Sequence, residues 1–458
     1  MARKHKMDLT NGSVLKVFVK FTIPIILSAL MQQLYHSADM WVVGNFSQNS
    51  EVALGAVGAS THIVTLILNF FVGITTGANI VCANYIGEGN KEGLARAMRT
   101  SIASALIGGI FVSVVGCLAA RPMLILLETP EALIDEAVLY LRIVFIGKIS
   151  ALLYNAGAGI LRAYGDSQRP MYILTGTGIL NVVLNLIFVV FFHWDAAGVA
   201  AATAIASTVS AVLILMILFH PQGEFDLNLL DVRIYLDELK QILRVGLPAG
   251  INSILFSISN LTVTSSLNGL GTQSVAGVSA ANSIINLLNI WVTGFSTSFV
   301  AFAAQNFGAK KIHRIDESIY KCISMGAVTL FGFAAILAIK PTFFVGIFTS
   351  DPVLAALGAK KLLVNGLSLP LHLIEAALNS AQRGMKHSAR ATSISLFFTI
   401  VPRIIWTMFI FPKLPQTLVF LFLCYPLSWG LAAIGQGISY FFLRKKTLAE
   451  FAREEAPV

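Results

Sequence analysis

The sequence predicts an all-α polytopic membrane protein with twelve transmembrane helices, arranged as two six-helix bundles that are related by a parallel pseudo-two-fold repeat. Three observations predict this fold class: the composition, the number of long apolar segments, and an internal repeat. Of the 458 residues, 56% are hydrophobic and 12% are charged, and the mean hydropathy is +0.77. Soluble domains contain about 25% charged residues, so this composition indicates a protein that lies in a bilayer.

A helix needs about 20 mostly apolar residues to cross a bilayer. Twelve segments of this kind follow one another along the chain. The first is longer than the apolar core of a signal peptide, so we expect it to be retained. The expected spans are 16–43, 53–81, 98–119, 138–161, 171–192, 196–219, 242–267, 275–304, 318–339, 357–382, 391–411 and 416–443.

Lysine and arginine residues are distributed asymmetrically between the two sides of these spans. Most lie at the two ends of the chain and in the loops that follow even-numbered spans. The loops after odd-numbered spans contain only Arg121, Lys340, Lys360, Lys361 and Lys413. The positive-inside rule therefore predicts that both termini are cytoplasmic, in the plasma (inner) membrane of a prokaryote. Because topology accounts for the formal net charge of +9, we expect no nucleic-acid partner.

The chain is expected to divide near its midpoint. Residues 220–240 form the longest polar stretch, and their second part reads as a short amphipathic helix on the cytoplasmic side. The predicted domains are an N-terminal six-helix lobe at 1–219, this linker at 220–240, and a C-terminal six-helix lobe at 241–458.

Three landmarks of the first half recur in the second half at a nearly constant distance along the chain. The offsets are 224, 221 and 221 residues, and the aligned pairs are Pro24 with Pro248, Gly87 with Gly308, and Arg162 with Arg383. Such regular spacing indicates an internal repeat. Each half has an even number of spans, so both halves insert with the same orientation. Many secondary transporters place their sites in or between such halves. The prolines are expected to act as hinges.

One acid lies deep in the first span. Gln32, His36 and Asp39 follow one another at helical spacing, with Tyr35 alongside. This polar stripe cannot face lipid, so we expect it to face the bundle or a wet cavity. An intramembrane acid is a candidate functional group by default; the alternative is a structural ion pair with Lys148 on the fourth span.

Three neutral polar residues on the fifth and sixth spans lie at a depth similar to that of Asp39. With a rise of 1.5 Å per residue, Asp39 lies about 9 Å from the outer end of its span, and Asn185 and Thr203 lie about 12 Å from theirs. Asn181 is one turn deeper than Asn185. A carboxylate with amide and hydroxyl oxygens suits a proton relay or a sodium site. For each neutral residue alone, helix–helix hydrogen bonding is an equal alternative.

The second half does not repeat the acid of the first. Its deep acid is Glu375, on the tenth span, and Arg403 on the eleventh is a candidate charge partner for it. We give equal weight to two roles of Glu375: recognition of a cationic substrate, and a structural ion pair with Arg403.

Several classes of site are not indicated by the sequence. The four cysteines and the scattered histidines show no spacing typical of a metal site, so we expect no metal other than sodium at Asp39 and no cofactor. No Walker motif is present, which argues against ATP. No nucleophile–base or paired-acid arrangement is visible, so we do not expect an enzyme.

Several short motifs occur in a characteristic order. They are Pro24 followed by D-M-W-V-V-G at 39–44, Y-I-G-E-G-N at 85–90, L-R-A-Y-G-D at 161–166, L-N-V-V-L-N-L-I-F at 180–188, and A-Q-N-F-G-A at 304–309. Together these motifs resemble the multidrug and toxic compound extrusion (MATE) family, a branch of the multidrug/oligosaccharidyl-lipid/polysaccharide flippase superfamily. The resemblance covers essentially the whole chain.

The resemblance implies a V-shaped, two-lobed fold with a central cavity. It also implies export of amphipathic organic cations, such as drugs, dyes and antimicrobials, in exchange for protons or sodium by a rocker-switch movement. Asp39 matches the family's acid on the first span, and Asn181 and Thr203 match members of the same network. Asn185 stands where many members have a second aspartate. The alternative from the same superfamily is a flippase for lipid-linked oligosaccharides or polysaccharides.

The expected substrate cavity is lined by apolar, aromatic and polar side chains, which tolerate varied substrates. Its predicted members are Met31, Gln32, Tyr35, His36, Trp41, Tyr154 and Glu375. Small organic cations and the bilayer are the expected partners, and we expect a monomer.

Overall fold

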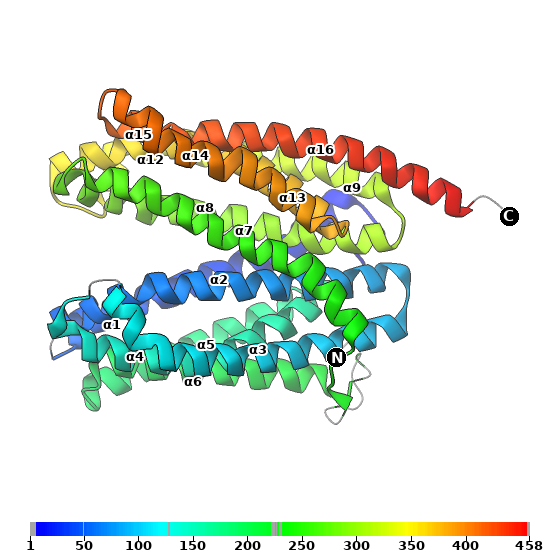
Figure 1. Ribbon diagram of the computed structural model, residues 1–458, viewed down its shortest axis with the longest axis horizontal. Helices are drawn as coiled ribbons and strands as arrows, with labels where there is room; N and C mark the ends of the chain where they lie inside the picture. The colour runs from blue at the N-terminus through cyan, green and yellow to red at the C-terminus, as the bar shows by residue number, and fades with distance from the viewer. Residues whose placement is uncertain are drawn as a thin grey trace. The chain divides into compact units, whose positions relative to one another are not determined.

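A computed structural model describes residues 6–48, 50–126, 129–220, 225, 227–228 and 231–455. Within these ranges the regular structure is helical and contains no strand (Figure 1). Twelve helical segments in the same ranges are long and apolar enough to cross a membrane. The predicted all-α, twelve-span fold is therefore confirmed. The helices extend beyond the expected spans at most ends, because a helix continues past the hydrocarbon layer that fixes its apolar length.

The first six spans are α1 to α6, and the last six are formed by α7 to α16. The first group comprises α1 (Val14–Phe46), α2 (Ser50–Glu88), α3 (Lys91–Leu126), α4 (Glu131–Ala163), α5 (Gln168–Leu186) with the π-helix η2 (Ile187–Phe191), and α6 (Asp195–Leu218). The second comprises α7 (Leu236–Asn268), α8 (Thr272–Gly308), α9 (Ile312–Ser318) with η4 (Ile319–Ile323), α10 (Ser324–Ile339), α11 (Pro341–Gly346), α12 (Pro352–Gly384), α13 (Ser388–Ser395), η5 (Leu396–Ile400), α14 (Val401–Ile405), η6 (Trp406–Ile410), η7 (Phe411–Lys413), α15 (Leu418–Phe422) and α16 (Cys424–Glu455).

The predicted linker is described only in part. Residues 221–224, 226 and 229–230 lie outside the described ranges, and residues 236–240 are the beginning of α7.

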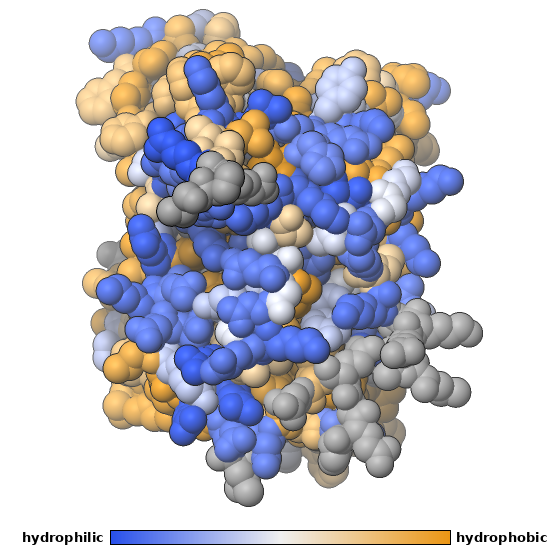
Figure 2. All heavy atoms as spheres, turned by 90° about the vertical axis from the view of Figure 1, so that its right-hand side faces the viewer, coloured by the Kyte–Doolittle hydropathy of each residue, from blue (hydrophilic) through white to orange (hydrophobic). Residues whose placement is uncertain are grey.

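Hydrophilic side chains gather on the face shown in Figure 2, the side on which the C-terminus lies in Figure 1, and the flanks of that view are hydrophobic. This distribution is typical of a protein whose flanks meet lipid and whose ends meet water.

The chain forms two compact units. The first part of α1 packs with the second half of the chain, and the first part of α7 packs with the first half. One unit contains Met1–Met7 and Leu27–Gly250, and the other contains Asp8–Ile26 and Ile251–Val458. The divisions inside α1 and α7 both fall two residues after a proline, Pro24 in α1 and Pro248 in α7. A proline removes one backbone hydrogen bond and favours a bend. Each helix therefore changes unit where its own backbone hydrogen bonding is interrupted.

The exchanged half of α7 is held in the first unit by glycine contacts with α2. A Cβ atom on Gly73 would lie 2.4 Å from the Cα of Gly250, and one on Gly77 would lie 2.5 Å from the carbonyl oxygen of Ile242. Such contacts allow two helix backbones to approach closely, as small residues do at membrane helix interfaces.

The exchanged half of α1 is held in the second unit by aromatic and polar contacts. The ring of Phe18 lies 4.7 Å from that of Phe299 between centroids. Before the helix begins, Arg314 donates hydrogen bonds to the carbonyl oxygens of Gly12 at 2.8 Å and Asn11 at 3.2 Å. Buried hydrogen bonds to a charged donor are among the stronger ones, so they fix the chain entering α1.

Replacing Gly73 with Val is expected to lower the unfolding temperature of the purified protein. The new side chain would overlap the backbone of α7, and overpacking of this kind typically costs about 1–3 kcal/mol. Circular dichroism or a thiol-reactive dye would measure the change in detergent. Gly176→Val is the control, because a Cβ at Gly176 meets no atom within 4 Å. Equal unfolding temperatures for the two variants would contradict the close contact.

Candidate functional site

The carboxylate of Asp39 accepts hydrogen bonds on both of its oxygens. The Nδ2 of Asn185, on α5, donates to Oδ1 at 2.5 Å. The Oγ1 of Thr203, on α6, donates to Oδ2 at 3.4 Å. Asp39 is itself half-buried near the end of α1. Three helices of the first unit thus converge on a single acid.

Asn181 completes this group by joining the two donors. Its Nδ2 donates to Thr203 Oγ1 at 3.2 Å, and its Oδ1 accepts from Asn185 Nδ2 at 3.3 Å. Asn181 and Asn185 lie one turn apart on α5, so both side chains leave the same face of the helix. The four residues Asp39, Asn181, Asn185 and Thr203, hereafter the Asp39 cluster, form a closed ring of hydrogen bonds.

One oxygen in the Asp39 cluster has no partner among the described residues. Asn185 is fully buried, and its Oδ1 makes no hydrogen bond within the described part of the chain. Leaving a buried acceptor unpaired costs about 1–3 kcal/mol. One residue after Asn185, α5 ends at Leu186 and the chain continues as the π-helix η2. π-Bulges frequently occur at functional sites. A buried, unpaired oxygen beside a carboxylate is suited to receive a proton donor or a cation.

Apolar side chains pack beside the Asp39 cluster toward the end of α1. Val42, Val43 and Val189 are fully buried there, and Tyr140 packs against the same group of side chains. A surrounding of this kind lowers the local dielectric constant. Charge–charge interactions at Asp39 are therefore stronger than they would be in water.

Two tyrosines of the expected substrate cavity are bound to α5. The hydroxyl of Tyr35 donates to the carbonyl oxygen of Leu174 at 2.6 Å, and that of Tyr154 donates to Pro170 at 3.1 Å. A Cβ on Gly178 would overlap the ring of Tyr35, so only glycine fits at that position. Both tyrosines therefore fix α5 in place, which in turn positions Asn181 and Asn185.

The other expected cavity residues on α1 are more accessible. Gln32 and His36 are exposed, Met31 is half-buried, and Trp41 is 57% exposed with its ring 5.4 Å from that of Phe46. Glu375 belongs to the other unit.

A family model confirms the relationship that the motifs indicated. The MatE family model matches residues 24–187 and 248–408, two segments that correspond to the two predicted halves. The chain belongs to the MatE family, the MATE transporters. The predicted membership is thus confirmed, and the two matched segments begin at Pro24 and Pro248.

Several curated relatives of this MATE protein come from bacteria. It is 29% identical to the "Probable multidrug resistance protein YoeA" of Bacillus subtilis (strain 168) over 321 residues, which are 68% of each chain. It is 26% identical to "Probable multidrug resistance protein YpnP" of the same organism over 440 residues, covering 95% of this chain and 94% of that one. It is also similar to "Multidrug export protein MepA" of Staphylococcus saprophyticus, with 22% identity over 79% of this chain and 80% of the relative.

Solved structures share the fold. An outward-facing multidrug resistance MATE transporter of the MOP superfamily aligns with a TM-score of 0.90 and 22% identity, covering 98% of this chain and 99% of that one. A MOP superfamily transporter from Pyrococcus furiosus Vc1 aligns with a TM-score of 0.89 and 22% identity, over 98% and 99% of the chains.

Lys148 of the MATE protein does not contact Asp39. It is half-buried on α4, and within the described ranges it forms no hydrogen bond or ion pair with Asp39. The structural ion pair that the sequence offered as the alternative for Asp39 is therefore absent among the described residues.

Glu375 and Arg403 are also not in direct contact among the residues described. Glu375 Oε1 accepts from the hydroxyl of Ser395 at 3.0 Å. Arg403 is fully buried and donates from Nε to Ser428 Oγ at 2.9 Å and from Nη1 to Asn260 Oδ1 at 3.3 Å. The two charges lie in one unit without an ion pair between them in the described part of the chain.

The surroundings of Arg403 were not anticipated from the sequence. Its guanidinium lies over three aromatic rings, at 4.9 Å from Phe256, 4.5 Å from Tyr425 and 5.3 Å from Trp429. A desolvated cation over aromatic rings gains roughly 2 kcal/mol or more. The available signal was the spacing of Tyr425 and Trp429, which places two rings on one face of α16.

Proposed function

We propose that this MATE protein is a secondary active antiporter that exports amphipathic organic compounds, mainly cations, in exchange for protons or sodium ions by rocker-switch alternating access. The Asp39 cluster is the observation that carries the proposal: a carboxylate held between three membrane helices, beside an unpaired buried oxygen. The names of the relatives, multidrug resistance and export proteins, support the same function.

The proposed coupling rests on the charge of Asp39. When the carboxylate is ionised, it attracts an organic cation strongly because its surroundings are apolar. A proton or sodium ion that reaches Asp39 removes this attraction, and the substrate leaves. A ligand shifts a conformational equilibrium only through its different affinities for the two states, so neutralisation of Asp39 must stabilise one state. Pro24 and Pro248 are the proposed bend points at which α1 and α7 respond.

The residues of the Asp39 cluster fit either coupling ion. Sodium is a hard cation that prefers oxygen ligands, and the cluster offers the Asp39 carboxylate, Thr203 Oγ1 and the unpaired Asn185 Oδ1. A proton needs only the carboxylate and an acceptor nearby, and Asn185 Oδ1 is such an acceptor. The chemistry of these donors therefore supports a site for one monovalent ion.

We further propose that the transporter works as a monomer without ATP, with both termini in the cytoplasm of a prokaryotic cell. The distribution of lysine and arginine between the loops supports this orientation. Gln32, His36 and Glu375 are the proposed polar groups that contact substrate.

Purified protein in liposomes tests the proposal. Ethidium transport is measured after a proton gradient or a sodium gradient is imposed separately, with protein-free liposomes as the baseline. Transport driven by one gradient and abolished by its ionophore is expected. Transport that needs neither gradient, or no ethidium movement under both, contradicts antiport of organic cations.

Replacing Thr203 with Val is expected to shift the ion dependence of efflux without abolishing transport. The variant keeps the shape but loses the hydroxyl that links Asn181 to Asp39. A hydrogen bond to a charged group is worth about 1.5–3 kcal/mol, which corresponds to roughly tenfold or more in an equilibrium constant. For sodium coupling, the lost oxygen ligand should raise the sodium concentration for half-maximal efflux by this factor. For proton coupling, the loss of a donor that stabilises the ionised carboxylate should lower the required proton concentration instead.

Thr208→Val is the matched control, since Thr208 lies on the same helix and bonds Ser150 rather than the Asp39 cluster. Equal effects of the two substitutions on ion dependence would show that Thr203 acts only in packing.

A further inference from the structure

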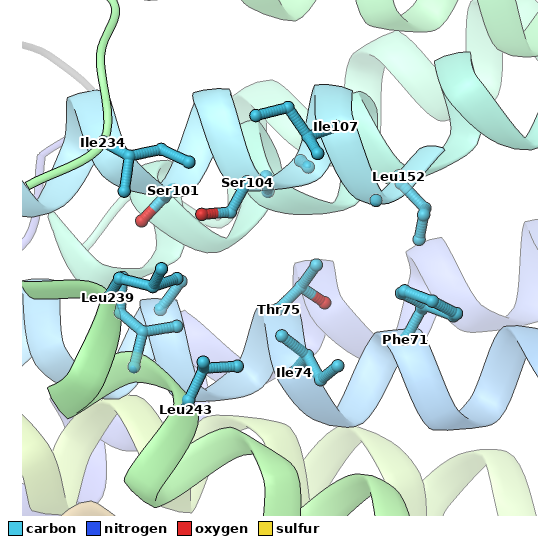
Figure 3. A pocket seen from close by; sticks show the side chains of 15 residues that line it. Phe71, Ile74, Thr75, Ser101, Ser104, Ile107, Leu152, Ile234, Leu239 and Leu243 are labelled. Atoms are coloured by element: carbon cyan, nitrogen blue, oxygen red, sulfur yellow. The ribbon is translucent and has the colours of Figure 1, made fainter. Parts of the chain in front are cut away.

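The first unit contains an apolar pocket that is separate from the Asp39 cluster. It has a volume of about 250 Å³ and lies between α2, α3, α4 and the beginning of α7. Figure 3 shows Ser104 and Ile107 of α3 facing Ile74 and Phe71 of α2 across this space. Leu239 and Leu243 line it from α7.

The pocket can accept little besides an apolar group. Of its polar lining residues, Thr75 and Ser101 already donate their hydroxyls to carbonyl oxygens of their own helices. Ser104 is the exception, because its Oγ is buried and has no hydrogen-bond partner among the described residues. The lining therefore suits a hydrocarbon chain with at most one polar atom.

The pocket opens on the outer surface of membrane-spanning helices. Its lining residue Ile107 is 56% exposed, and Leu243 is 37% exposed. It extends from Ser101 to Gly108 along α3, which is about 10 Å at 1.5 Å per residue. An opening of this length on the apolar flank of a membrane protein is accessible to the acyl chain of a lipid.

Two basic residues lie next to the lining residues of α7. Lys240 follows Leu239, Arg244 follows Leu243, and both are exposed. Neither forms an ion pair with another residue in the described part of the chain. Basic residues close to a membrane surface attract anionic lipids, by about 1 kcal/mol for each charge.

The internal repeat relates three lining positions of this pocket to larger side chains in the second unit. With the offsets of the repeat, Ile74, Ala78 and Ile242 correspond to Phe295, Phe299 and Phe18 of the second unit. Those three phenylalanines are buried, and Phe18 packs against the other two with centroids at 5.7 and 4.7 Å. Aromatic rings therefore occupy in one unit the positions whose smaller side chains leave a pocket in the other.

The repeat also relates the basic residues. Lys240 and Arg244 correspond to Lys16 and Lys20 on α1, which are exposed in the same way. The two units thus present equal charge at equivalent positions. In the first unit this charge lies beside a pocket, whereas in the second unit phenylalanine rings occupy the corresponding lining positions.

We propose that this pocket binds one acyl chain of an anionic glycerophospholipid whose phosphate contacts Lys240 and Arg244. The apolar lining, the opening on the flank and the adjacent positive charge together fit this class of ligand. The proposal does not depend on the exported substrate, because the pocket and the Asp39 cluster share no residue.

Native mass spectrometry of the detergent-purified protein tests the proposal, with dioleoyl phosphatidylglycerol as the probe and dioleoyl phosphatidylcholine as the neutral comparison. We expect one phosphatidylglycerol to be retained per chain. The double variant Lys240→Gln/Arg244→Gln should lower its apparent affinity about thirtyfold. The matched control Lys16→Gln/Lys20→Gln should leave the affinity unchanged.

A second variant fills the pocket with the side chains of the second unit, Ala78→Phe/Ile242→Phe. It should lose the retained lipid while keeping its unfolding temperature. If this variant does not fold, the comparison of the two charge variants tests the lipid site. Equal losses in the two charge variants, no retained lipid, or full retention by a folded filled variant would each overturn the proposal. Transport is not measured in any arm, so failure here is distinct from failure of the antiport proposal.

Discussion

Replacing Asp39 with Asn is expected to reduce gradient-driven ethidium efflux to the level of protein-free liposomes. The amide has nearly the same size. Its oxygen can still accept from Asn185 Nδ2, and its NH2 group takes the place of Oδ2 and can donate to Thr203 Oγ1, so the packing of the site is kept. What is lost is the negative charge, on which the proposed exchange of ion and substrate depends. Efflux from proteoliposomes under an imposed proton or sodium gradient is the measurement.

The control for this substitution is Asp135→Asn, which removes an exposed acid that pairs with Arg121 at 3.1 Å. Exposed ion pairs contribute about 0–1 kcal/mol, so this variant should transport like the unmodified protein. Insertion of both variants is compared by size-exclusion chromatography. Full efflux by a well-folded Asp39→Asn protein would contradict the proposed coupling mechanism.

Replacing Arg403 with Ala is expected to destabilise the second unit strongly. The change removes a side chain packed among Phe256, Tyr425 and Trp429 and leaves a cavity between their rings. Removing large buried side chains typically costs about 3–5 kcal/mol. The unfolding temperature in detergent should therefore fall well below that of the unmodified protein.

Arg403→Met separates packing from charge at the same position. Methionine fills much of the space, and the buried guanidinium lacks a carboxylate in contact and has an unpartnered Nη2 among the described residues. Removing the guanidinium loses its cation–π contacts, but it also removes the cost of burying a charge with no carboxylate in contact, so the two effects oppose each other. The Met variant should therefore lose less than about 1.5 kcal/mol. A loss as large as that of the Ala variant would show that the cation itself holds the rings together.

The polar residues of the candidate site illustrate how far sequence reasoning extends. Depth along each helix follows from a constant rise per residue, so Asp39, Asn185 and Thr203 could be placed at similar depths before any contact was known. Depth alone could not exclude Lys148, which the sequence offers as the partner of Asp39 in a structural ion pair. The rotation of each helix decides which side chains meet, and rotation depends on packing against neighbours.

Arg403 shows the same limit in the second unit. The sequence placed it and Glu375 on neighbouring spans and offered an ion pair. In the structure Glu375 bonds Ser395, and Arg403 bonds Ser428 and Asn260 beneath aromatic rings. These partners lie 20 or more residues away along the chain, and no local pattern relates them.

The sequence by itself determined the twelve spans, the repeat and the presence of one acid in the first span. Each of these depends on hydrophobic length, helical spacing or self-similarity, which are properties of the chain read locally. Only the tertiary structure decided that Asp39 meets Asn185 and Thr203, that α1 and α7 exchange their first halves, and that one unit keeps open a pocket that three phenylalanines fill in the other. Those features depend on which helix faces touch. Packing between segments distant in the sequence sets them, because side-chain volumes must fit together across helices.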